Sequence, residues 1–158
     1  MSTNNKNITI RPAANNDLPK LAEFLQTLVD AERPFDPTLK EGEIFYYDIQ
    51  ELISDKATEI MVVESNNEII GSGYAQIRSA KPYEKHEVFG YLGFMFVSPE
   101  FRGQGISGLL LTALKKWILD QGITEVRLQV YDENEAAVRA YEKAGFKKIV
   151  TTMRCDIG

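Results

Sequence analysis

The sequence predicts a mixed α/β fold, in which a mostly antiparallel central sheet of about six to seven strands has helices on both faces. In the first half, segments with alternating apolar residues are joined by short turns, which is typical of antiparallel strands. In the second half, strand-like and helix-like segments alternate, and a strand–helix–strand crossover makes its two strands parallel. The chain has 158 residues, of which 44% are hydrophobic. We therefore expect one domain over residues 1–158.

The first half is expected to form three strands and two helices. Leu18, Leu21 and Leu25 recur at helical spacing. This helix is expected to end at residues 33–37, because a residue that precedes a proline avoids helical angles. Asn66 and Asn67 tolerate the left-handed angles of a tight hairpin turn. In order, the expected elements are a strand over residues 8–11, a helix from residue 16 or 17, a helix near 47–53, and strands over 59–65 and 68–78.

The second half is expected to form three strands and two further helices. Gly122 and Gly145 suit the left-handed ends of the two helices, and Phe146 can fold back onto the second. Asn134 suits the start of that second helix, where its side chain caps free N–H groups. In order, the expected elements are a strand over residues 88–97, a helix from residue 106, a strand over 126–130, a helix over 135–144 and a last strand over 147–155.

Composition argues against several classes of function. The formal net charge of -5 disfavours a general nucleic-acid binder, because phosphate contacts need a basic surface. No apolar run approaches the roughly 18 residues of a membrane helix, and the polar residues 1–7 lack the apolar stretch of a secretory signal. The single histidine, His86, has no partners at metal-ligand spacing, so we expect no metal. One cysteine, Cys155, allows no internal disulfide, which favours a cytoplasmic location.

A glycine segment follows the expected strand over residues 88–97. Gly103, Gly105 and Gly108 match the pattern G-x-G-x-x-G at the start of a helix, where uncovered N–H groups and the helix dipole favour a pyrophosphate. A dinucleotide site fits poorly, because residues 98–102 intervene and too little chain follows for the remaining strands. A nucleotide-hydrolase loop lacks its Gly-Lys-Ser/Thr. The remaining alternative is that the glycines serve only a tight turn and close helix packing.

Two motifs resemble those of the GNAT N-acetyltransferase superfamily. Residues 102–107, Arg-Gly-Gln-Gly-Ile-Ser, resemble its acyl-CoA signature Q/R-x-x-G-x-G/A, and Val97-Ser98-Pro99 resembles its usual V-x-P. Ser107 departs from the usual Gly or Ala, but serine is small enough to preserve a close approach. The order of elements is similar from about Ile8 to the C-terminus. A second motif, N-x-x-A-x-x-x-Y-x-x-x-G-F, is matched by Asn134, Ala137, Tyr141, Gly145 and Phe146.

The resemblance implies acetyl-CoA as a co-substrate. The pyrophosphate is then expected on the backbone N–H groups of residues 103–108, and the pantetheine arm along the strand edge at 95–97. Arg102 is expected to support the phosphate end, with a solvated surface arginine as the alternative. Asn134 caps its helix, contacts the arm, or does both. The residues expected to bind the co-substrate are Met95, Phe96, Val97, Arg102, Gly103, Gln104, Gly105, Ile106, Ser107, Gly108, Asn134 and Tyr141.

Tyr141 is the residue that the resemblance implies for catalysis, as the general acid that protonates the departing thiolate. A phenol with a pKa of about 10 is protonated at neutral pH, whereas a thiol such as cysteine has a pKa of about 8.5. Proton donation is then modestly uphill unless the surroundings tune it. The alternative is a core tyrosine on the face that Ala137, Ala140 and Ala144 share.

The general base is less evident. Some members of the superfamily carry a glutamate five residues before the asparagine, where this chain has Gln129, which cannot accept a proton. Carboxylates near the expected acceptor site suit a cationic amine and are candidates for accepting its proton, directly or through water. Ordinary solvated loop charges are the alternative. The candidates for the substrate site are Glu32, Asp36, Glu87 and Tyr91.

We therefore expect an acetyl-CoA-dependent N-acetyltransferase that acts by direct attack of a primary amine on the thioester. The acceptor is a small molecule, a peptide or a protein. A non-catalytic acyl-CoA-binding sensor is the alternative, which would keep the glycine cradle without needing Tyr141. A dinucleotide-dependent oxidoreductase is a third possibility, which predicts a longer parallel sheet. Edge strands or exposed aromatic surfaces allow a homodimer.

Overall fold

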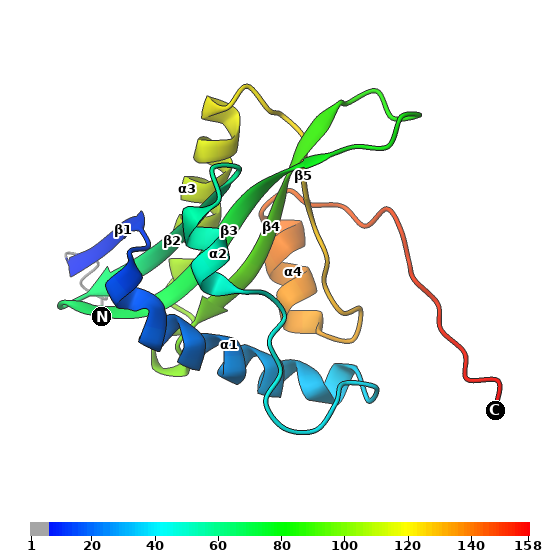
Figure 1. Cartoon of the computed structure of the whole chain (residues 1–158), viewed down its shortest axis with the longest axis horizontal. Helices are drawn as coiled ribbons and strands as arrows, with labels where there is room; N and C mark the ends of the chain where they lie inside the picture. The colour runs from blue at the N-terminus through cyan, green and yellow to red at the C-terminus, as the bar shows by residue number, and fades with distance from the viewer. Residues whose placement is uncertain (1–6) are drawn as a thin grey trace.

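The computed structural model describes residues 7–158, which form a sheet of strands together with several helices (Figure 1). Residues 1–6, most of the segment expected to lack a secretory signal, lie outside the described residues. In residues 7–158, no helix has the length and apolar character needed to cross a membrane. Three short 3-10 helices are η2 (Asn15–Asp17), η3 (Arg33–Phe35) and η4 (Pro99–Phe101). The main elements are β1 (Ile8–Pro12), α1 (Leu18–Glu32), α2 (Ile49–Ser54), β2 (Thr58–Ser65), β3 (Glu68–Ser79), β4 (Val88–Val97), α3 (Ile106–Asp120), β5 (Val126–Leu128) and α4 (Glu135–Lys143).

The strands form one sheet in the order β1-β2-β3-β4-β5. The first four are antiparallel neighbours, and β5 runs parallel to β4, as the crossover through α3 predicted. The expected count of six to seven strands is wrong for residues 7–158, where the sheet has five. The expected last strand, over residues 147–155, forms no strand. It runs away from the sheet as an extended tail and so has no neighbour to pair with (Figure 1).

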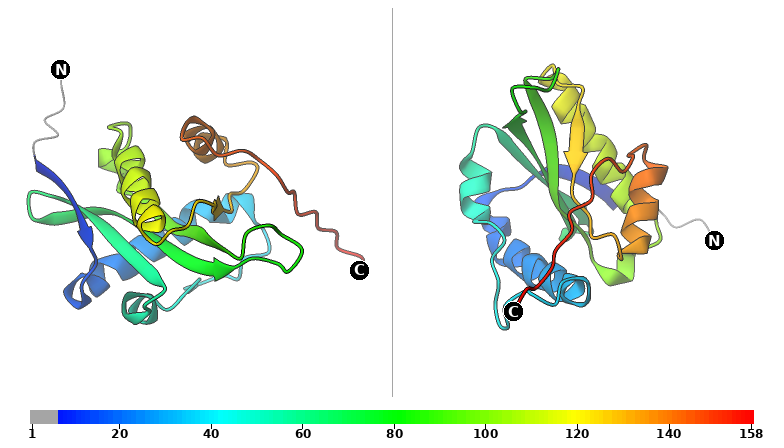
Figure 2. Two further views of the ribbon diagram at one scale, coloured as in Figure 1. Left: turned by 90° about the horizontal axis from the view of Figure 1, so that it is seen from above. Right: turned by 90° about the vertical axis from the view of Figure 1, so that its right-hand side faces the viewer.

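The sheet separates two apolar cores, with helices on both faces as predicted (Figure 2). On one face, α1 and α2 cover a core to which α1 contributes the fully buried Leu21 and Leu25. On the other face, α3 buries Leu110 and Leu114 against the sheet. Burial of each such side chain contributes about 1.5–3 kcal/mol. Both cores close over β3 and β4, which fixes these two strands at the centre of the molecule.

The predicted turns are confirmed, with one correction. Asn66 and Asn67 both take left-handed angles, with φ values of 51° and 65°, and join β2 to β3 in a tight hairpin. Gly122, with φ 79°, follows the end of α3. α1 does end at the predicted break, but not for the predicted reason. Arg33 keeps helical angles (φ -51°, ψ -42°) although it precedes Pro34, because the proline starts the tighter turn of η3.

β4 carries a bulge at its centre. Phe94 and Met95 of β4 together face the single residue Gly73 of β3. Phe94 has a φ of 55°, a left-handed conformation that is uncommon for a bulky side chain. Gly93 has no room for a side chain, since a Cβ there would overlap the ring of Tyr74. The bulge therefore depends on a glycine packed against a buried aromatic ring.

We expect Gly93→Ala to lower the free energy of unfolding by about 1–3 kcal/mol, because the added methyl group forces Tyr74 to move within a filled core. The control is Gly108→Ala in α3, where a Cβ meets no atom within 4 Å. Alanine is also favoured over glycine there by about 1 kcal/mol. Urea unfolding followed by circular dichroism measures both. A Gly93→Ala protein as stable as the wild type would contradict the tight packing.

Candidate functional site

The glycine segment forms an open turn that leads into α3. Gly103 and Gly105 both have a φ of 79°, which glycine adopts without strain. Gly105 is the N-cap of α3 and offers no side chain to cap it, so the N–H groups of Ile106, Ser107 and Gly108 lack a side-chain partner from the cap residue. Gly103, Gly105, Ser107 and Gly108 are exposed. The turn thus presents uncapped N–H groups at the surface, which fits an anion such as a pyrophosphate.

An unpaired edge of β4 lies next to this turn. β5 pairs with β4 only from Gly90 to Leu92. Beyond the bulge, no strand of residues 7–158 pairs with Met95, Phe96 and Val97 on that side. An extended arm with amide groups can pair along such an edge like an added strand. The exposed Arg102 donates from Nε to the Val97 carbonyl oxygen at 3.0 Å, which ties the glycine turn to the end of β4.

α4 ends in a Schellman motif that positions Tyr141. The N–H of Phe146 donates to the Tyr141 carbonyl oxygen, and the N–H of Gly145 donates to that of Glu142, both at 3.0 Å. Gly145 has a φ of 99°, which favours glycine. Phe146 folds back as predicted and lies edge-on against Tyr141, with 5.9 Å between the ring centroids. The Gly-Phe pair therefore holds the tyrosine ring in place.

The surroundings of Tyr141 keep its phenol protonated. Burial, followed by the negative charge of Glu32 and then by Tyr91, raises the pKa of Tyr141 to about 12. The ring is half-buried and packs at the margin of the core under α3. The ring of Tyr141 therefore packs against the core, and its hydroxyl group remains a possible hydrogen-bond donor. The expected tuning toward a more acidic phenol is not found, since the proton is held more tightly than in free tyrosine.

Glu32 lies near tyrosines from several parts of the chain. Burial raises the pKa of the half-buried Glu32 carboxyl. Burial is also the main cause of the raised pKa of each tyrosine, and the Glu32 charge adds to it. We call these residues the Glu32 cluster: Glu32, Tyr46, Tyr47, Tyr91, Tyr131 and Tyr141.

The sequence analysis identified only some members of this cluster as candidate site residues. Glu32, Tyr91 and Tyr141 are among them, whereas Tyr46, Tyr47 and Tyr131 are not. The aromatic run Phe45-Tyr46-Tyr47, in the connection between α1 and α2, was the available signal. Tyr91 also stacks under the guanidinium of Arg78, whose Cζ lies 3.7 Å from the ring centroid.

Asp36 is occupied by hydrogen bonds. Its carboxylate accepts from the Thr38 hydroxyl at 2.6 Å, from Arg154 at 2.9 Å and from the Tyr131 hydroxyl at 3.1 Å. These bonds, that of Thr38 first, hold the pKa of the Asp36 carboxyl well below its usual range. The side chain is only 13% exposed. Asp36 therefore ties the loop after α1 to the segment after β5 and to the C-terminal tail, and its acceptor sites are already used.

Glu87 lies apart from these contacts, whereas Gln129 contacts one member of the Glu32 cluster. Glu87 is exposed at the start of β4, in the connection from β3. Its neighbour in that connection, Glu84, pairs with Arg127 of β5 at 2.7 Å. Gln129 is exposed and accepts from the Tyr91 hydroxyl at 3.4 Å. The structure therefore brings Glu32 and Tyr91 together and leaves Glu87 outside that group.

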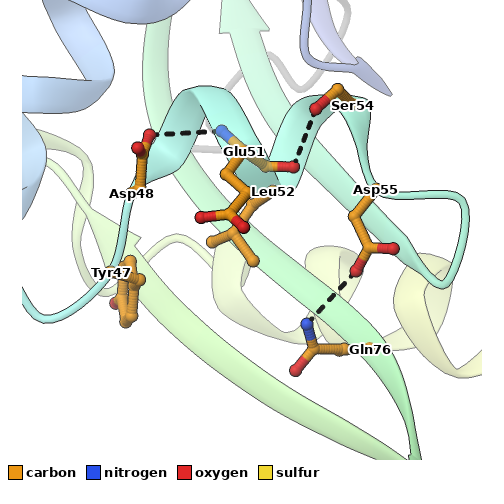
Figure 3. A pocket seen from close by; sticks show the side chains of 7 residues that line it. All are labelled: Tyr47, Asp48, Glu51, Leu52, Ser54, Asp55 and Gln76. Atoms are coloured by element: carbon orange, nitrogen blue, oxygen red, sulfur yellow. Dashed lines mark hydrogen bonds between the residues drawn. The ribbon is translucent and has the colours of Figure 1, made fainter.

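A surface hollow of about 620 Å³ lies beside α2 and β3, lined by seven residues (Figure 3). Three of them are carboxylates, and two of these serve the local structure. Asp48 caps α2 by accepting from the Glu51 N–H at 3.2 Å. Asp55 accepts from the Thr58 hydroxyl at 2.7 Å and from Gln76 at 3.4 Å. None of the residues predicted to bind the co-substrate lines this hollow, so we do not assign the site to it.

The five-stranded mixed sheet, the open edge of β4 and the exposed glycine turn at the start of α3 fit the class of protein that transfers acyl groups from acyl-CoA. A model of the acetyltransferase (GNAT) family matches residues 23–146. The chain therefore belongs to the GNAT family and is an acetyl-CoA-dependent N-acetyltransferase.

Individual proteins are similar to this chain in sequence or in fold. The acetyltransferase ECA0875 of Pectobacterium atrosepticum is 29% identical over 102 residues, which is 65% of this chain and 67% of that protein. A predicted acetyltransferase of Clostridium acetobutylicum, solved with acetyl-CoA, has a TM-score of 0.72 at 19% identity and covers 95% of this chain and 96% of its own. The aminoglycoside acetyltransferase meta-AAC0020 from an uncultured soil metagenomic sample, solved with sisomicin, has a TM-score of 0.69 at 22% identity over 97% and 98%.

Substitutions of Asn134 can separate its two expected roles, capping of α4 and contact with the pantetheine arm. Its Oδ1 accepts from the Ala137 N–H at 3.3 Å, so it caps α4 as predicted. Asn134→Ala is expected to cost about 1 kcal/mol of stability, whereas Asn134→Ser keeps a capping oxygen and most of that stability. Thermal unfolding measures both. If the amide also contacts the co-substrate, Asn134→Ser weakens acetyl-CoA binding at nearly unchanged stability, and unchanged binding leaves Asn134 as a cap alone.

Proposed function

We propose that this enzyme acetylates the primary amine of a cationic small molecule or peptide, with Glu32 beside the amine and Tyr141 beside the thioester sulfur. The observation that carries the proposal is the Glu32 cluster, in which burial and also the charge of a half-buried carboxylate raise the pKa of Tyr141 and of four other tyrosines. A half-buried carboxylate and tyrosine rings both suit an ammonium group, which binds each of them. The fold neighbour solved with sisomicin supports a small-molecule acceptor.

The donor half of the proposal uses the glycine turn and the open edge of β4. The N–H groups of residues 103–108 hold the pyrophosphate, with Arg102 beside it. The backbone of residues 95–97 pairs with the pantetheine arm. This arrangement directs the thioester along β4 toward Tyr91 and Tyr141. We further propose that residues 1–158 act as one domain in the cytoplasm and that no metal takes part.

Glu32 is proposed to take up the proton of the amine. An amine with a pKa of about 10.4 pays about 4–5 kcal/mol to lose its proton at pH 7. The ammonium ion first gives one proton to Glu32, directly or through water, because a protonated nitrogen has no lone pair with which to attack. The neutral amine then attacks the thioester carbonyl, and the second N–H proton, which becomes acidic as the C–N bond forms, leaves to solvent. Burial raises the pKa of Glu32, which makes its carboxylate a stronger base than an exposed glutamate.

Tyr141 is proposed to serve the leaving group. The C–N bond forms, the C–S bond breaks, and negative charge develops on the departing sulfur. With a pKa of about 12 for Tyr141 and about 8.5 for a reference thiol, complete transfer to a free thiolate is uphill by about 5 kcal/mol. Tyr141 therefore acts mainly as a hydrogen-bond donor to the sulfur while negative charge develops there, and solvent completes the protonation.

Tyr141→Phe tests the acid role. Wild-type protein incubated with acetyl-CoA and a panel of diamines, aminoglycosides and lysine peptides is expected to release free CoA thiol. Tyr141→Phe should lower kcat about 100-fold, because the donor to the sulfur is lost, and should leave acetyl-CoA affinity nearly unchanged. An unchanged kcat removes Tyr141 from the mechanism. Acetyl-CoA binding without turnover across the panel favours the sensor alternative instead.

Glu32→Gln tests the base and the acceptor site. Loss of a charge-assisted contact of about 1.5 kcal/mol should raise KM for a cationic acceptor about tenfold. The pKa of Glu32 is raised, so the carboxylate is ionised only above that raised value. Wild-type kcat/KM should therefore fall as the pH drops through it, and the variant should lack this limb.

The matched control is Glu23→Gln on the same helix, whose side chain is 68% exposed. It should leave both KM and the pH profile unchanged. Stability provides a second control. An acid with a raised pKa in the folded state destabilises that state above its unfolded pKa, so Glu32→Gln should unfold at the same temperature as the wild type or at a higher one. An unchanged acidic limb in Glu32→Gln would exclude Glu32 as the base.

A further inference from the structure

Arg78 of β3 is a half-buried cation that has no carboxylate partner in residues 7–158. Among the arginines of this part of the chain, only Arg78 and Arg102 take part in no ion pair. Arg102 lies exposed at the glycine turn. A guanidinium group stays charged at every ordinary pH, and its removal from water is costly unless it is paired. The unpaired and half-buried Arg78 is therefore suited to an anion from outside the chain.

Neutral groups hold the guanidinium of Arg78 in one position. Its Nε donates to the side-chain oxygen of Gln76 at 2.8 Å. Gln76 is itself fixed, because its amide nitrogen donates to the Thr58 hydroxyl at 3.1 Å and to Asp55 at 3.4 Å (Figure 3). The guanidinium also lies over the ring of Tyr91, with 3.7 Å between Cζ and the ring centroid. The cation is thus oriented in advance, which lowers the entropy cost of binding a ligand.

The terminal nitrogens of this guanidinium are little used. In residues 7–158, Nη2 has one contact, with the Tyr74 hydroxyl at 3.5 Å, which is long for a hydrogen bond. Two nitrogens at one edge of a guanidinium match the two coplanar oxygens of a carboxylate. A phosphate monoester carries a charge of about -1.5 to -2, more than the single positive charge of Arg78 balances. Shape and charge therefore favour a carboxylate as the ligand.

Tyr91 connects Arg78 to the proposed acceptor region. Its ring lies 6.5 Å from that of Tyr74, which lies 5.5 Å from the ring of Tyr47 in the Glu32 cluster. Burial raises the pKa of Tyr91, the charge of Arg78 lowers it, and the charge of Glu32 adds a smaller rise. A cation and an anion thus both influence this one hydroxyl.

Arg127, the other arginine on this part of the sheet, is already neutralised. It lies opposite Tyr91 in the parallel pairing of β4 with β5. Its guanidinium pairs with Glu84 at 2.7 Å. An acceptor that reaches Tyr91 therefore meets a single unpaired guanidinium there, that of Arg78.

We propose that Arg78 binds a carboxylate of the acceptor and thereby determines its specificity. The acceptor is then a zwitterion, with its amine beside Glu32 and its carboxylate on Arg78. This inference rests on the proposed function, and it narrows the acceptor from cationic amines in general to amino acids and short peptides with a free carboxylate. Arg78 transfers no proton and forms no covalent bond. Its two hydrogen bonds fix one end of the acceptor, which orients the amine toward the thioester.

The test compares acceptors that differ in one group only, with release of CoA thiol from saturating acetyl-CoA as the measurement. L-lysine is paired with L-lysinamide, and glycyl-L-lysine with its amide. The wild type is expected to use each acid with a kcat/KM about tenfold above that of its amide, mainly through KM, because a charge-assisted contact contributes about that factor. This comparison requires no variant.

Arg78→Gln should raise KM for the two acids about tenfold and leave KM for the two amides unchanged, since only the acids lose a contact. Arg78→Lys keeps the charge but not the planar pair of donors, and should restore part of the preference for acids. The matched control is Arg139→Gln on α4, whose side chain is 71% exposed. It should keep the full preference.

An equal loss of kcat/KM for acids and amides in Arg78→Gln overturns the proposal, because Arg78 would then only support the ring of Tyr91. A wild type that uses acids and amides equally also overturns it. Better turnover of phosphoethanolamine than of β-alanine overturns the assignment to a carboxylate. In each of these cases an amine is still acetylated, so the proposed function stands. Absence of turnover with every acceptor overturns both.

Discussion

The bulge in β4 is the constraint on which both halves of the site depend. It ends the pairing with β5 after Leu92, which opens the edge of β4 beside the glycine turn. The same bulge makes room for Tyr74, whose ring occupies the space that a side chain on Gly93 would fill. Tyr74 in turn packs against Tyr47 and Tyr91, with ring centroids 5.5 and 6.5 Å away. One local distortion thus opens the edge proposed for the donor and supports part of the aromatic cluster proposed for the acceptor.

Two carboxylates four residues apart have opposite environments, and this separates their roles. Burial raises the pKa of Glu32, so its carboxylate is a stronger base than that of an exposed glutamate. Hydrogen bonds, first from Thr38 and then from Arg154, lower the pKa of Asp36, whose charge is fully used in holding the fold together. The contrast follows from the helix, since α1 ends at Glu32 among the tyrosines while Asp36 lies beyond η3 in the loop. The surroundings of each carboxyl group, and not its residue type, decide whether its pKa is raised or lowered.

The sequence was sufficient to predict those turns and helix ends whose conformation depends on neighbouring residues alone. The turns at Asn66-Asn67, Gly105 and Gly145-Phe146 could be predicted from the sequence. In each case the left-handed backbone angle, and any side-chain contact that it allows, depends only on residues close by in the chain. Phe94 could not, because its left-handed φ is imposed by the register with β3 and by the ring of Tyr74. The Glu32 cluster was only half foreseen, since its members come from separate elements that meet only in the folded chain. The tail illustrates the same limit, because strand propensity at 149–152 cannot supply the neighbour that a strand needs.

Asp36 also connects the tail to the acceptor region. Arg154 of the tail and Tyr131 of the Glu32 cluster donate to the two different oxygens of this one carboxylate. A displacement of the tail therefore changes the charge that the Tyr131 hydroxyl faces, and Tyr131 lies within reach of Glu32. Since the pKa of Tyr131 is raised by burial and then by its bond to Asp36, the loss of Arg154 would leave the Asp36 charge less compensated and raise that pKa further. The anchoring of the tail and the pKa of the Tyr131 hydroxyl therefore depend on the same hydrogen bonds around Asp36.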